Sequence, residues 1–380
     1  MLVNKERLLK EFETLVSFDS ESYEERKIAD YLIQRLQALG LDVMEDNANH
    51  ILKEEGILQE LSKSAGNVFG ILKGKRSGDG ILFSSHMDTV KPGKGKKVIF
   101  HENGKITSDG TTILGADDAG GLAAILEALT VIKEEGLEHV NIEVLFPIAE
   151  EDYAQGSRIF DYTRISAKLA YVFDLSGEIG TAALAAPTVY SFQIRIYGKS
   201  AHAGFCPQDG IHAIHIASMA LQQFQNGWGN DATSVNFGTI NGGIAHNIVP
   251  DFVEITGEVR SLEHKNALKK MEQIQQIFEQ IAKEFGGKAD VKSNVGVHAY
   301  RIDEEEEVVQ RYLKACANIG IEFPELIQTL GGSDNNYLVF NGVRGIVVAS
   351  AMQNVHTTHE YTTQQDLVKS AQLVLQLATL

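Results

Sequence analysis

The stretch Gly80-Ile-Leu-Phe-Ser-Ser-His86-Met-Asp88-Thr89 joins an uninterrupted apolar run to a histidine and an aspartate. An apolar run of this length predicts a strand that is buried on both faces of a parallel sheet. Because side chains alternate along an extended chain, His86 and Asp88 project the same way from the end of that strand. By itself this pair is weak evidence for a functional site. The motifs that follow along the chain strengthen it.

Apolar strands that end in acids recur downstream. Residues 141–149 lead into Glu150-Glu151-Asp152, and residues 169–173 lead into Asp174. Since open parallel sheets bind ligands at the carboxyl ends of their strands, we expect these acids and the histidine to share one crevice. Adjacent carboxylates repel each other unless a cation lies among them, which favours a metal site.

A third acidic segment, Gly115-Ala-Asp117-Asp118, leads into a predicted helix over residues 122–133. Helix capping and the helix macrodipole would by themselves account for two aspartates at this position. From the pattern alone, the pair therefore stays open between a structural and a functional role.

The composition limits the class of protein. The length of 380 residues suggests two domains, and the net charge of -17 argues against nucleic-acid or anionic-membrane partners. Cys206 and Cys316 lack CxxC spacing, so neither a disulfide framework nor a thiolate zinc site is expected. The charged amphipathic start and the lack of a membrane-length apolar run predict a cytoplasmic protein without a membrane partner.

The pattern of polar and apolar residues changes between residues 187 and 299. Strands with alternating polarity and amphipathic helices follow one another there in the order β-α-β-β-α-β, which is the ferredoxin-like order. We therefore expect an inserted α+β domain over residues 187–299 and an α/β domain formed by residues 1–186 and 300–380. Two local expectations concern the α/β part, namely a helix within residues 51–62 and a hairpin over residues 98–107.

The ordered motifs resemble one enzyme family. His86-x-Asp88, Gly115-Ala-Asp-Asp118, Glu150-Glu151, Asp174 and His356 resemble the co-catalytic zinc exopeptidases that include peptidase T, carboxypeptidase G and aminoacylase. The resemblance covers essentially the whole chain. It is strongest to peptidase T, because Ser108-Asp-Gly-Thr-Thr-Ile-Leu-Gly-Ala-Asp-Asp118 nearly reproduces a motif of that group. It implies an α/β/α catalytic domain, with the inserted domain acting as a lid and as the surface of a homodimer.

The resemblance also implies two Zn²⁺ ions per subunit. We favour Asp118 over Asp117 as the bridging acid, because the family's bridging acid stands three residues after the glycine. Imidazole and carboxylate ligands without thiolate suit zinc, with Mn²⁺ or Co²⁺ as substitutes. The implied ligands are His86, Asp174 and bridging Asp118 for one ion, and Glu151, His356 and the same Asp118 for the other.

Other residues carry roles implied by the resemblance. Asp88 is expected to accept the second N–H of His86 and to fix its tautomer, and Glu150 to act as the general base. No role follows for Asp152, which we interpret as a solvated acid. His359 is not expected to be a ligand, because the family pattern is His-x-x-x-Glu with His356 as the histidine. The loop from Gly331 to Asp334 resembles one that lines the family's site, without an assigned role.

The inserted domain supplies three further candidates. His202, in Gly198-Lys-Ser-Ala-His202, resembles the lid histidine that steadies the oxyanion, often from a partner subunit. Asn247 and Arg260 resemble the substrate-binding pair, in which the guanidinium binds a substrate carboxylate. An ordinary ion pair between Arg260 and Glu258 is the alternative.

These observations predict a di-zinc aminopeptidase that acts on short peptides, with tripeptides expected by analogy. An N-acyl amino acid amidohydrolase of the same superfamily is the close alternative. A non-catalytic metal-binding scaffold and a zinc phosphoesterase are alternatives of other classes. Ala119 departs from the lysine common after the bridging acid in peptidase T relatives, which leaves the fine substrate preference open.

Overall fold

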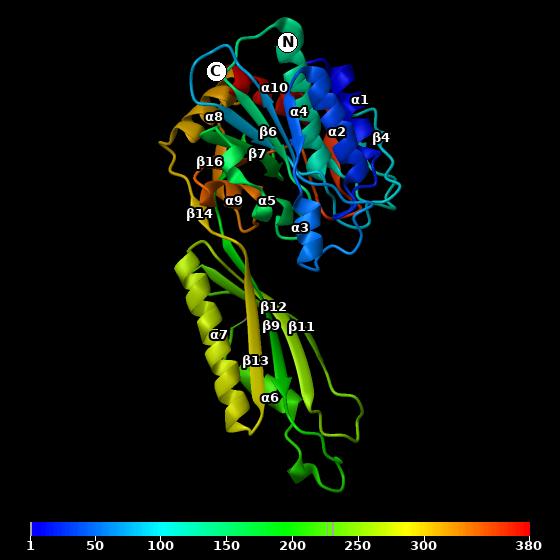
Figure 1. Ribbon diagram of the computed structural model, residues 1–380, viewed down its shortest axis with the longest axis vertical. Coiled ribbons are helices and arrows are strands. Elements are labelled where there is room, and N and C mark those ends of the chain that lie inside the picture. Colours follow the sequence, from blue (N-terminus) through cyan, green and yellow to red (C-terminus); the bar gives the residue numbers. More distant parts are fainter. Residues whose placement is uncertain (1, 226, 230–231) are drawn as a thin grey trace. The chain divides into compact units, whose positions relative to one another are not determined.

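The chain forms two compact units (Figure 1). The computed structural model describes residues 2–225, 227–229 and 232–380. Unit 1 comprises Met1–Ala185, Arg301–Thr329 and Ser333–Leu380, and unit 2 comprises Ala186–Tyr300 and Leu330–Gly332. Unit 2 is therefore an insertion in the sequence of unit 1.

Unit 1 is built on a nine-stranded mixed sheet. In its middle, β3 runs parallel to β6 on one side and to β7 on the other. Every residue of β3 and β6 is buried, as expected for strands that are covered on both faces. The order across the sheet is β1 (Asp42–Glu45), β2 (Val68–Leu72), β6 (Ile142–Phe146), β3 (Ile81–Ser84), β7 (Leu169–Leu175), β16 (Arg344–Ala349), β8 (Thr181–Ala186) and β14 (Tyr300–Arg301), with β15 (Glu325–Gln328) also paired to β8.

Helices cover both faces of this sheet. Leu82 and Phe83 are neighbours in β3 and project to opposite faces. Leu82 packs with Leu338 of α9 (Asp334–Phe340), whereas Phe83 packs on Phe173, which lies beneath Gly121 of α4 (Ala116–Glu135). The α/β/α layering agrees with the predicted fold class. The other helices of this unit are α1 (Lys5–Val16), α2 (Arg26–Leu39), α3 (Ala48–Glu54), α5 (Gln155–Ile159), α8 (Glu307–Asn318) and α10 (Gln364–Thr379).

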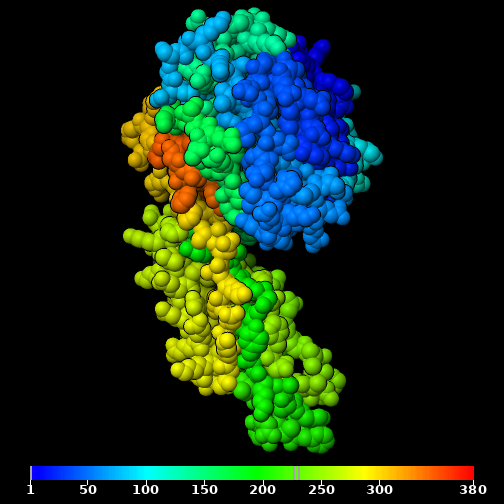
Figure 2. Space-filling model, viewed as in Figure 1, coloured from blue at the N-terminus to red at the C-terminus, as the bar shows by residue number. Residues whose placement is uncertain are grey.

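The N-terminal helices, drawn in blue, form one outer side of unit 1 (Figure 2). Helices α1 and α2 both pack against the long helix α4, which is buried along most of its length. The connection between α1 and α2 is consequently held close to the protein interior, where Ser20, Glu21 and Glu25 are all buried. Among the described residues, no helix is both long enough and apolar enough to cross a membrane.

Two local predictions had different outcomes. The helix expected within residues 51–62 is wrong beyond Glu54, because α3 ends there and Gly56 takes a φ of 77°. This left-handed conformation is one that glycine adopts readily and that stops a helix. The expected hairpin over residues 98–107 is present as β4 (Ile99–Phe100) and β5 (Lys105–Thr107), and β5 also pairs with β17 (Tyr361–Thr363).

Unit 2 is an antiparallel sheet with two helices. Alternate residues of β9, namely Phe192, Ile194 and Ile196, are buried in the same apolar cluster as Ile274 and Phe278 of α7. The chain order of the long strands and helices is the predicted ferredoxin-like order. The sheet consists of β10 (Gly227–Trp228), β11 (Thr233–Gly242), β12 (Phe252–Ser261), β9 (Thr188–Tyr197) and β13 (Lys288–Val297), and the helices are α6 (Ala213–Leu221) and α7 (His264–Glu284).

Candidate metal centre

Three adjacent parallel strands of unit 1 deliver side chains to one edge of the sheet. The strand order β6, β3, β7 places Glu150, His86 and Asp174 at or just beyond neighbouring carboxyl ends. Ligand atoms of these three residues lie within 4.8 Å of one another. A second set of atoms with the same spacing comes from His86, Asp117 and Glu151. The acids Glu150, Glu151 and Asp174 therefore cluster with His86 at this edge of the sheet, as the sequence predicted.

His356 joins this group from the loop that follows β16. Its Nε2 atom lies 3.1 Å from Oε2 of Glu151 and 3.2 Å from Oδ2 of Asp117. The loop holds Ala351, Asn354 and His356 at positive φ angles of 68°, 53° and 61°. Such conformations are costly for residues other than glycine and are concentrated at functional sites.

The structure corrects the choice between the paired aspartates. Asp117 lies between the two histidines, with Oδ1 3.0 Å from Nε2 of His86 and Oδ2 3.2 Å from Nε2 of His356. Asp118, which the sequence favoured as the bridging acid, does not take this position. The Asp118 carboxylate is turned into the protein, where Oδ2 accepts from the Ser85 hydroxyl (2.5 Å) and Oδ1 accepts from Gly121 N (3.2 Å).

Backbone geometry accounts for this difference. Asp117 and Asp118 stand before the regular part of α4 and have non-helical dihedral angles, with ψ values of 98° and 34°. Consecutive side chains in such a segment point in different directions, so only one of them faces the crevice. Burial by itself would raise the pKa of Asp117, but hydrogen bonds from His356 and His86 outweigh it and hold this pKa below its usual range.

Asp88 also differs in part from its predicted role. Nδ1 of His86 donates to the backbone carbonyl oxygen of Asp88 at 2.9 Å, while the Asp88 carboxylate is 3.5 Å away. That carboxylate instead accepts from Glu150 N at 2.9 Å and from Glu151 N at 3.2 Å. Residue 88 thus orients the imidazole through its main chain, and it orients the two glutamates through its side chain.

The acids of the crevice fit a cation. Burial raises the pKa of Glu151, of Asp174 and of Glu150, and the charge of Asp174 raises the pKa of Glu150 further. Oε1 of Glu151 is buried and has no hydrogen-bond partner among the described residues. Because carboxylate oxygens and imidazole nitrogens are ligands that divalent metals accept, the donor set present here suits a metal centre.

Glu360 is a residue of this site whose role was not found in the sequence. It is buried, and its carboxylate accepts from Gly115 N at 2.7 Å and from Asp117 N at 3.0 Å. Burial raises its pKa to about 7. Glu360 stands four residues after His356 and so ties the loop of His356 to the backbone of Asp117. The only signal in the sequence is this four-residue spacing, which does not by itself indicate a partner.

The remaining candidates lie in unit 2. Nδ1 of the exposed His202 accepts from Gly204 N at 3.1 Å and from Phe205 N at 3.2 Å, which makes Nε2 the protonated nitrogen. Asn247 is exposed, and its backbone carbonyl oxygen accepts from Ala203 N at 3.0 Å. This backbone hydrogen bond joins the loop of His202 to the loop of Asn247.

Arg260 is engaged within unit 2. Its guanidinium makes the ion pair with Glu258 that the sequence left open as an alternative, at 2.8 Å and 3.0 Å. A third N–H, on Nη1, donates to the carbonyl oxygen of Leu330 at 2.9 Å. A carboxylate ligand at this guanidinium would have to share it with Glu258.

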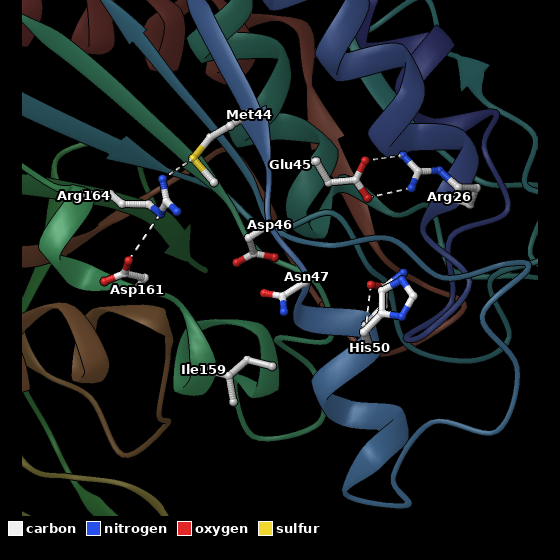
Figure 3. Close-up of a pocket in the computed structure, with 10 residues that line it drawn as sticks. Arg26, Met44, Glu45, Asp46, Asn47, His50, Ile159, Asp161 and Arg164 are labelled. Atoms are coloured by element: carbon white, nitrogen blue, oxygen red, sulfur yellow. Dashed lines mark hydrogen bonds and ion pairs between the residues drawn. The ribbon is translucent and has the colours of Figure 1, made fainter.

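A separate pocket in unit 1 has a volume of about 600 Å³ (Figure 3). Four of its charged side chains are paired among themselves, since Arg26 binds both carboxylate oxygens of Glu45 and Arg164 lies 3.4 Å from Asp161. None of the residues that line it belongs to the two clusters of candidate metal ligands. The pocket is therefore not part of the candidate centre.

Two family models match parts of the chain. A peptidase dimerisation domain of the M20 type matches residues 187–286, and peptidase family M28 matches residues 67–204. The first range lies within unit 2. The second includes the strands that carry His86 and Glu150.

Known proteins are similar over almost the whole chain. The uncharacterised protein YqjE of Bacillus subtilis is 39% identical over 375 residues, which cover 98% of each chain. The aminopeptidase PepT from Bacillus cereus is 38% identical, with a TM-score of 0.91 over 100% of this chain and 99% of that chain. A tripeptidase from Staphylococcus aureus is 34% identical, with a TM-score of 0.93 at the same coverage. A dinuclear metal-binding peptidase of the M20 family from Bacillus subtilis is 18% identical, with a TM-score of 0.74, and shares the fold.

Proposed function

We propose that this chain, which belongs to the family of peptidase T and related tripeptidases within the M20 peptidases, is an aminopeptidase that hydrolyses tripeptides. The observation that carries the proposal is the cluster formed by His86, Asp117, Glu150, Glu151 and Asp174 at the carboxyl edge of the sheet. The full-length similarity to an aminopeptidase and to a tripeptidase supports the same reaction.

We infer that the centre holds two divalent metal ions. His86 and Asp174 would hold one ion, Glu151 and His356 would hold the other, and Asp117 would bridge them. The bridging role follows from the position of Asp117 between the two histidines. Zinc suits this donor set, with manganese or cobalt as substitutes. When bound, such a pair of ions polarises the scissile carbonyl and lowers the pKa of a water molecule.

Glu150 is the proposed general base. It follows a buried strand, and its amide is held by Asp88, so its carboxylate has a defined position beside His86 and Asp174. Its raised pKa brings this group closer to the range in which a carboxylate accepts a proton from water and returns it to the leaving amine. Glu151 pairs with His356 instead, which separates the roles of the two neighbouring glutamates.

Unit 2 supplies the proposed substrate contacts. His202 would donate its Nε2 proton to the oxyanion of the tetrahedral intermediate, because Nδ1 already accepts two backbone N–H groups. Asn247 and Arg260 would bind the substrate, with the guanidinium contacting its terminal carboxylate. In a short peptide the terminal carboxylate lies close to the amino-terminal scissile bond, whereas in a longer peptide it lies far from it.

We propose a catalytic domain formed by residues 1–186 and 300–380 and a lid of residues 187–299. The lid would also form a homodimer, as the match to a peptidase dimerisation domain over residues 187–286 supports. A cytoplasmic location is proposed because Cys206 and Cys316 are unpaired thiols, which a reducing compartment preserves.

A substrate panel tests the proposed function. Protein reconstituted with zinc, manganese or cobalt is assayed on tripeptides, amino-terminally blocked tripeptides and N-acyl amino acids, with and without a chelator. We expect metal-dependent cleavage of tripeptides that have a free amino terminus. Turnover of N-acyl amino acids alone would identify an amidohydrolase instead. Turnover of a phosphate ester alone would identify a phosphoesterase, and metal binding without any turnover a scaffold.

A further inference from the structure

The segment from Ile148 to Asp152, which carries both glutamates of the site, is held by its backbone amides. Four consecutive N–H groups donate to buried side chains from other parts of the chain. In order, Ile148 N donates to Asn67 Oδ1 (3.1 Å), Ala149 N to Glu25 Oε1 (3.1 Å), Glu150 N to Asp88 Oδ1 (2.9 Å) and Glu151 N to Asp88 Oδ2 (3.2 Å).

This segment needs such support because its backbone is strained. Ala149 within the segment and Tyr153 and Ala154 directly after it have positive φ angles of 48°, 59° and 52°, although none of them is glycine. Conformations of this kind persist only where the surrounding structure enforces them. The positions of Glu150 and Glu151 therefore depend on the groups that bind the segment.

Residues 22–25, in the connection between α1 and α2, provide several of these groups. Oε1 of Glu25, which is fully buried, accepts from Tyr23 N at 2.7 Å as well as from Ala149 N. The hydroxyl of Ser22 donates to Oδ2 of Asp88 at 2.7 Å. The hydroxyl of Tyr23 donates to the carboxylate of Asp152. Residues 22–25 thus contact the glutamate segment at both of its ends and also contact Asp88.

Residues 22–25 are themselves anchored at both ends. Arg26 follows Glu25 directly, and its guanidinium forms a fork with both carboxylate oxygens of Glu45 at 2.6 Å and 3.0 Å (Figure 3). Its backbone N–H donates to the carbonyl oxygen of Lys63 at 2.8 Å. On the other side, Ser22 N donates to the carbonyl oxygen of Thr89 at 3.3 Å. Residues 22–25 are consequently a fixed support.

We propose that residues 22–25 form a positioning clamp for the general base, in which Glu25 holds the backbone amide of Ala149 and Tyr23 holds the side chain of Asp152, so that the Glu150 carboxylate keeps its reactive position. The proposal rests on the proposed function, because it takes Glu150 as the base. Glu25 and Tyr23 act through the backbone and through Asp152, and so they are positioning residues. The clamp also gives Asp152 a role, as the acceptor of the Tyr23 hydroxyl.

Glu25 offers an informative pair of substitutions. Glu25→Ala removes the acceptor of Ala149 N, whereas Glu25→Gln retains one acceptor oxygen in the same place. Burial and the charge of Asp88 raise the pKa of Glu25 to about 8, so a neutral glutamine is a close replacement at pH 7. The two variants therefore separate the loss of the hydrogen bond from the loss of the carboxyl group itself.

The first test measures amide hydrogen exchange together with steady-state kinetics. In Glu25→Ala, we expect exchange of the 148–152 amides to accelerate about tenfold or more, because a buried donor loses its acceptor. We expect kcat on a tripeptide to fall roughly 10- to 100-fold with KM within about twofold, because a misplaced base slows the chemical step. Glu25→Gln should restore both quantities to within about threefold. Unchanged exchange and kcat in Glu25→Ala, or a glutamine variant as impaired as the alanine variant, would overturn the proposal.

A second pair of variants addresses folding. Tyr23→Phe removes only the hydroxyl that binds Asp152, and Tyr31→Phe is its control, since Tyr31 donates to Glu11 at 2.5 Å between α1 and α2. Both should lower Tm, but only Tyr23→Phe should lower kcat, by about threefold or more. An equal effect of both on kcat would overturn the clamp. If the unmodified protein cleaves no peptide, the proposed function fails, while the exchange measurement still decides whether the clamp exists.

Discussion

The residues proposed for chemistry are held in different ways in the two units. In unit 1, the amides of the glutamate segment donate to Asp88 and Glu25, which are 62 and 124 residues away in sequence. In unit 2, His202 is oriented by amides two and three residues further along, and Arg260 binds Glu258 on its own strand. The candidate metal centre is thus fixed by long-range packing, whereas the unit 2 contacts are local and exposed.

This difference predicts how strongly each region responds to substitution. A group held by buried long-range contacts cannot adjust when a partner is lost, so changes in unit 1 should affect metal binding or kcat strongly. An exposed group with local partners retains freedom to move, so changes in unit 2 should mainly affect substrate affinity. Four predictions test this contrast, in order of decreasing effect.

The largest effect is expected from Glu150→Gln. Loss of the base should lower kcat about 10²- to 10⁴-fold, while the metal content measured by elemental analysis stays at the unmodified level. Glu138→Gln removes an exposed carboxylate shortly before β6, the strand that leads to Glu150. It serves as the control, and its activity should be unchanged. A Glu150→Gln variant with normal turnover would refute the assigned base.

The next effect separates the neighbouring aspartates. Asp117→Asn should weaken metal affinity by more than the roughly 10- to 100-fold expected for a residue that only orients a ligand, because both ions lose a ligand. Asp118→Asn should retain metal affinity and lose about 1–3 kcal/mol of unfolding free energy, because the amide keeps only one acceptor oxygen and either Ser85 or Gly121 loses its acceptor. Metal titration and denaturant unfolding measure the two quantities. The opposite pattern would restore Asp118 as the bridging acid.

Glu360→Ala should have a smaller effect. It removes the acceptor of Gly115 N and Asp117 N, so metal affinity should fall roughly 10- to 100-fold without being abolished. The adjacent substitution His359→Ala is the control, and it should leave metal titration unchanged. Equal losses from both would indicate a general disturbance of the loop.

The smallest effect is expected in unit 2. Arg260→Lys should raise KM for tripeptides about tenfold with little change in kcat, because an ammonium replaces a guanidinium that can bind a carboxylate through two N–H groups. For peptides with an amidated carboxyl terminus, KM should be the same in Arg260→Lys and in the unmodified protein. Arg195→Lys is a matched control, since Arg195 pairs with Glu254 at 2.9 Å on neighbouring strands of the same sheet. A KM increase of equal size in the control would exclude a specific role for Arg260.

The sequence predicted the fold and much of the crevice for identifiable reasons. Parallel strands that are buried on both faces have apolar runs as their sequences, and the polar residue after each run lies at the strand's carboxyl end. This reasoning located His86, Glu150, Glu151 and Asp174. The alternation of polar and apolar residues in β9 likewise predicted a sheet with one covered face.

The sequence could not locate residues that act through distant contacts. Glu25 and Asn67 belong to no motif, and their link to the glutamate segment exists only after the chain has folded. Glu360 was visible only by its distance from His356. In each case the partner is a backbone amide, and a backbone amide leaves no signature in the sequence.

The sequence by itself determined the kinds of side chain available to the crevice and the strands that carry them, because period and polarity survive in the order of residues. The tertiary structure decided which of two identical neighbours faces the two histidines. Asp117 and Asp118 have the same chemistry, and only the non-helical backbone at the start of α4 turns one toward His86 and His356 and the other toward Ser85. The same holds for residue 88, whose carbonyl oxygen faces the histidine while its carboxylate binds the amides of the glutamates.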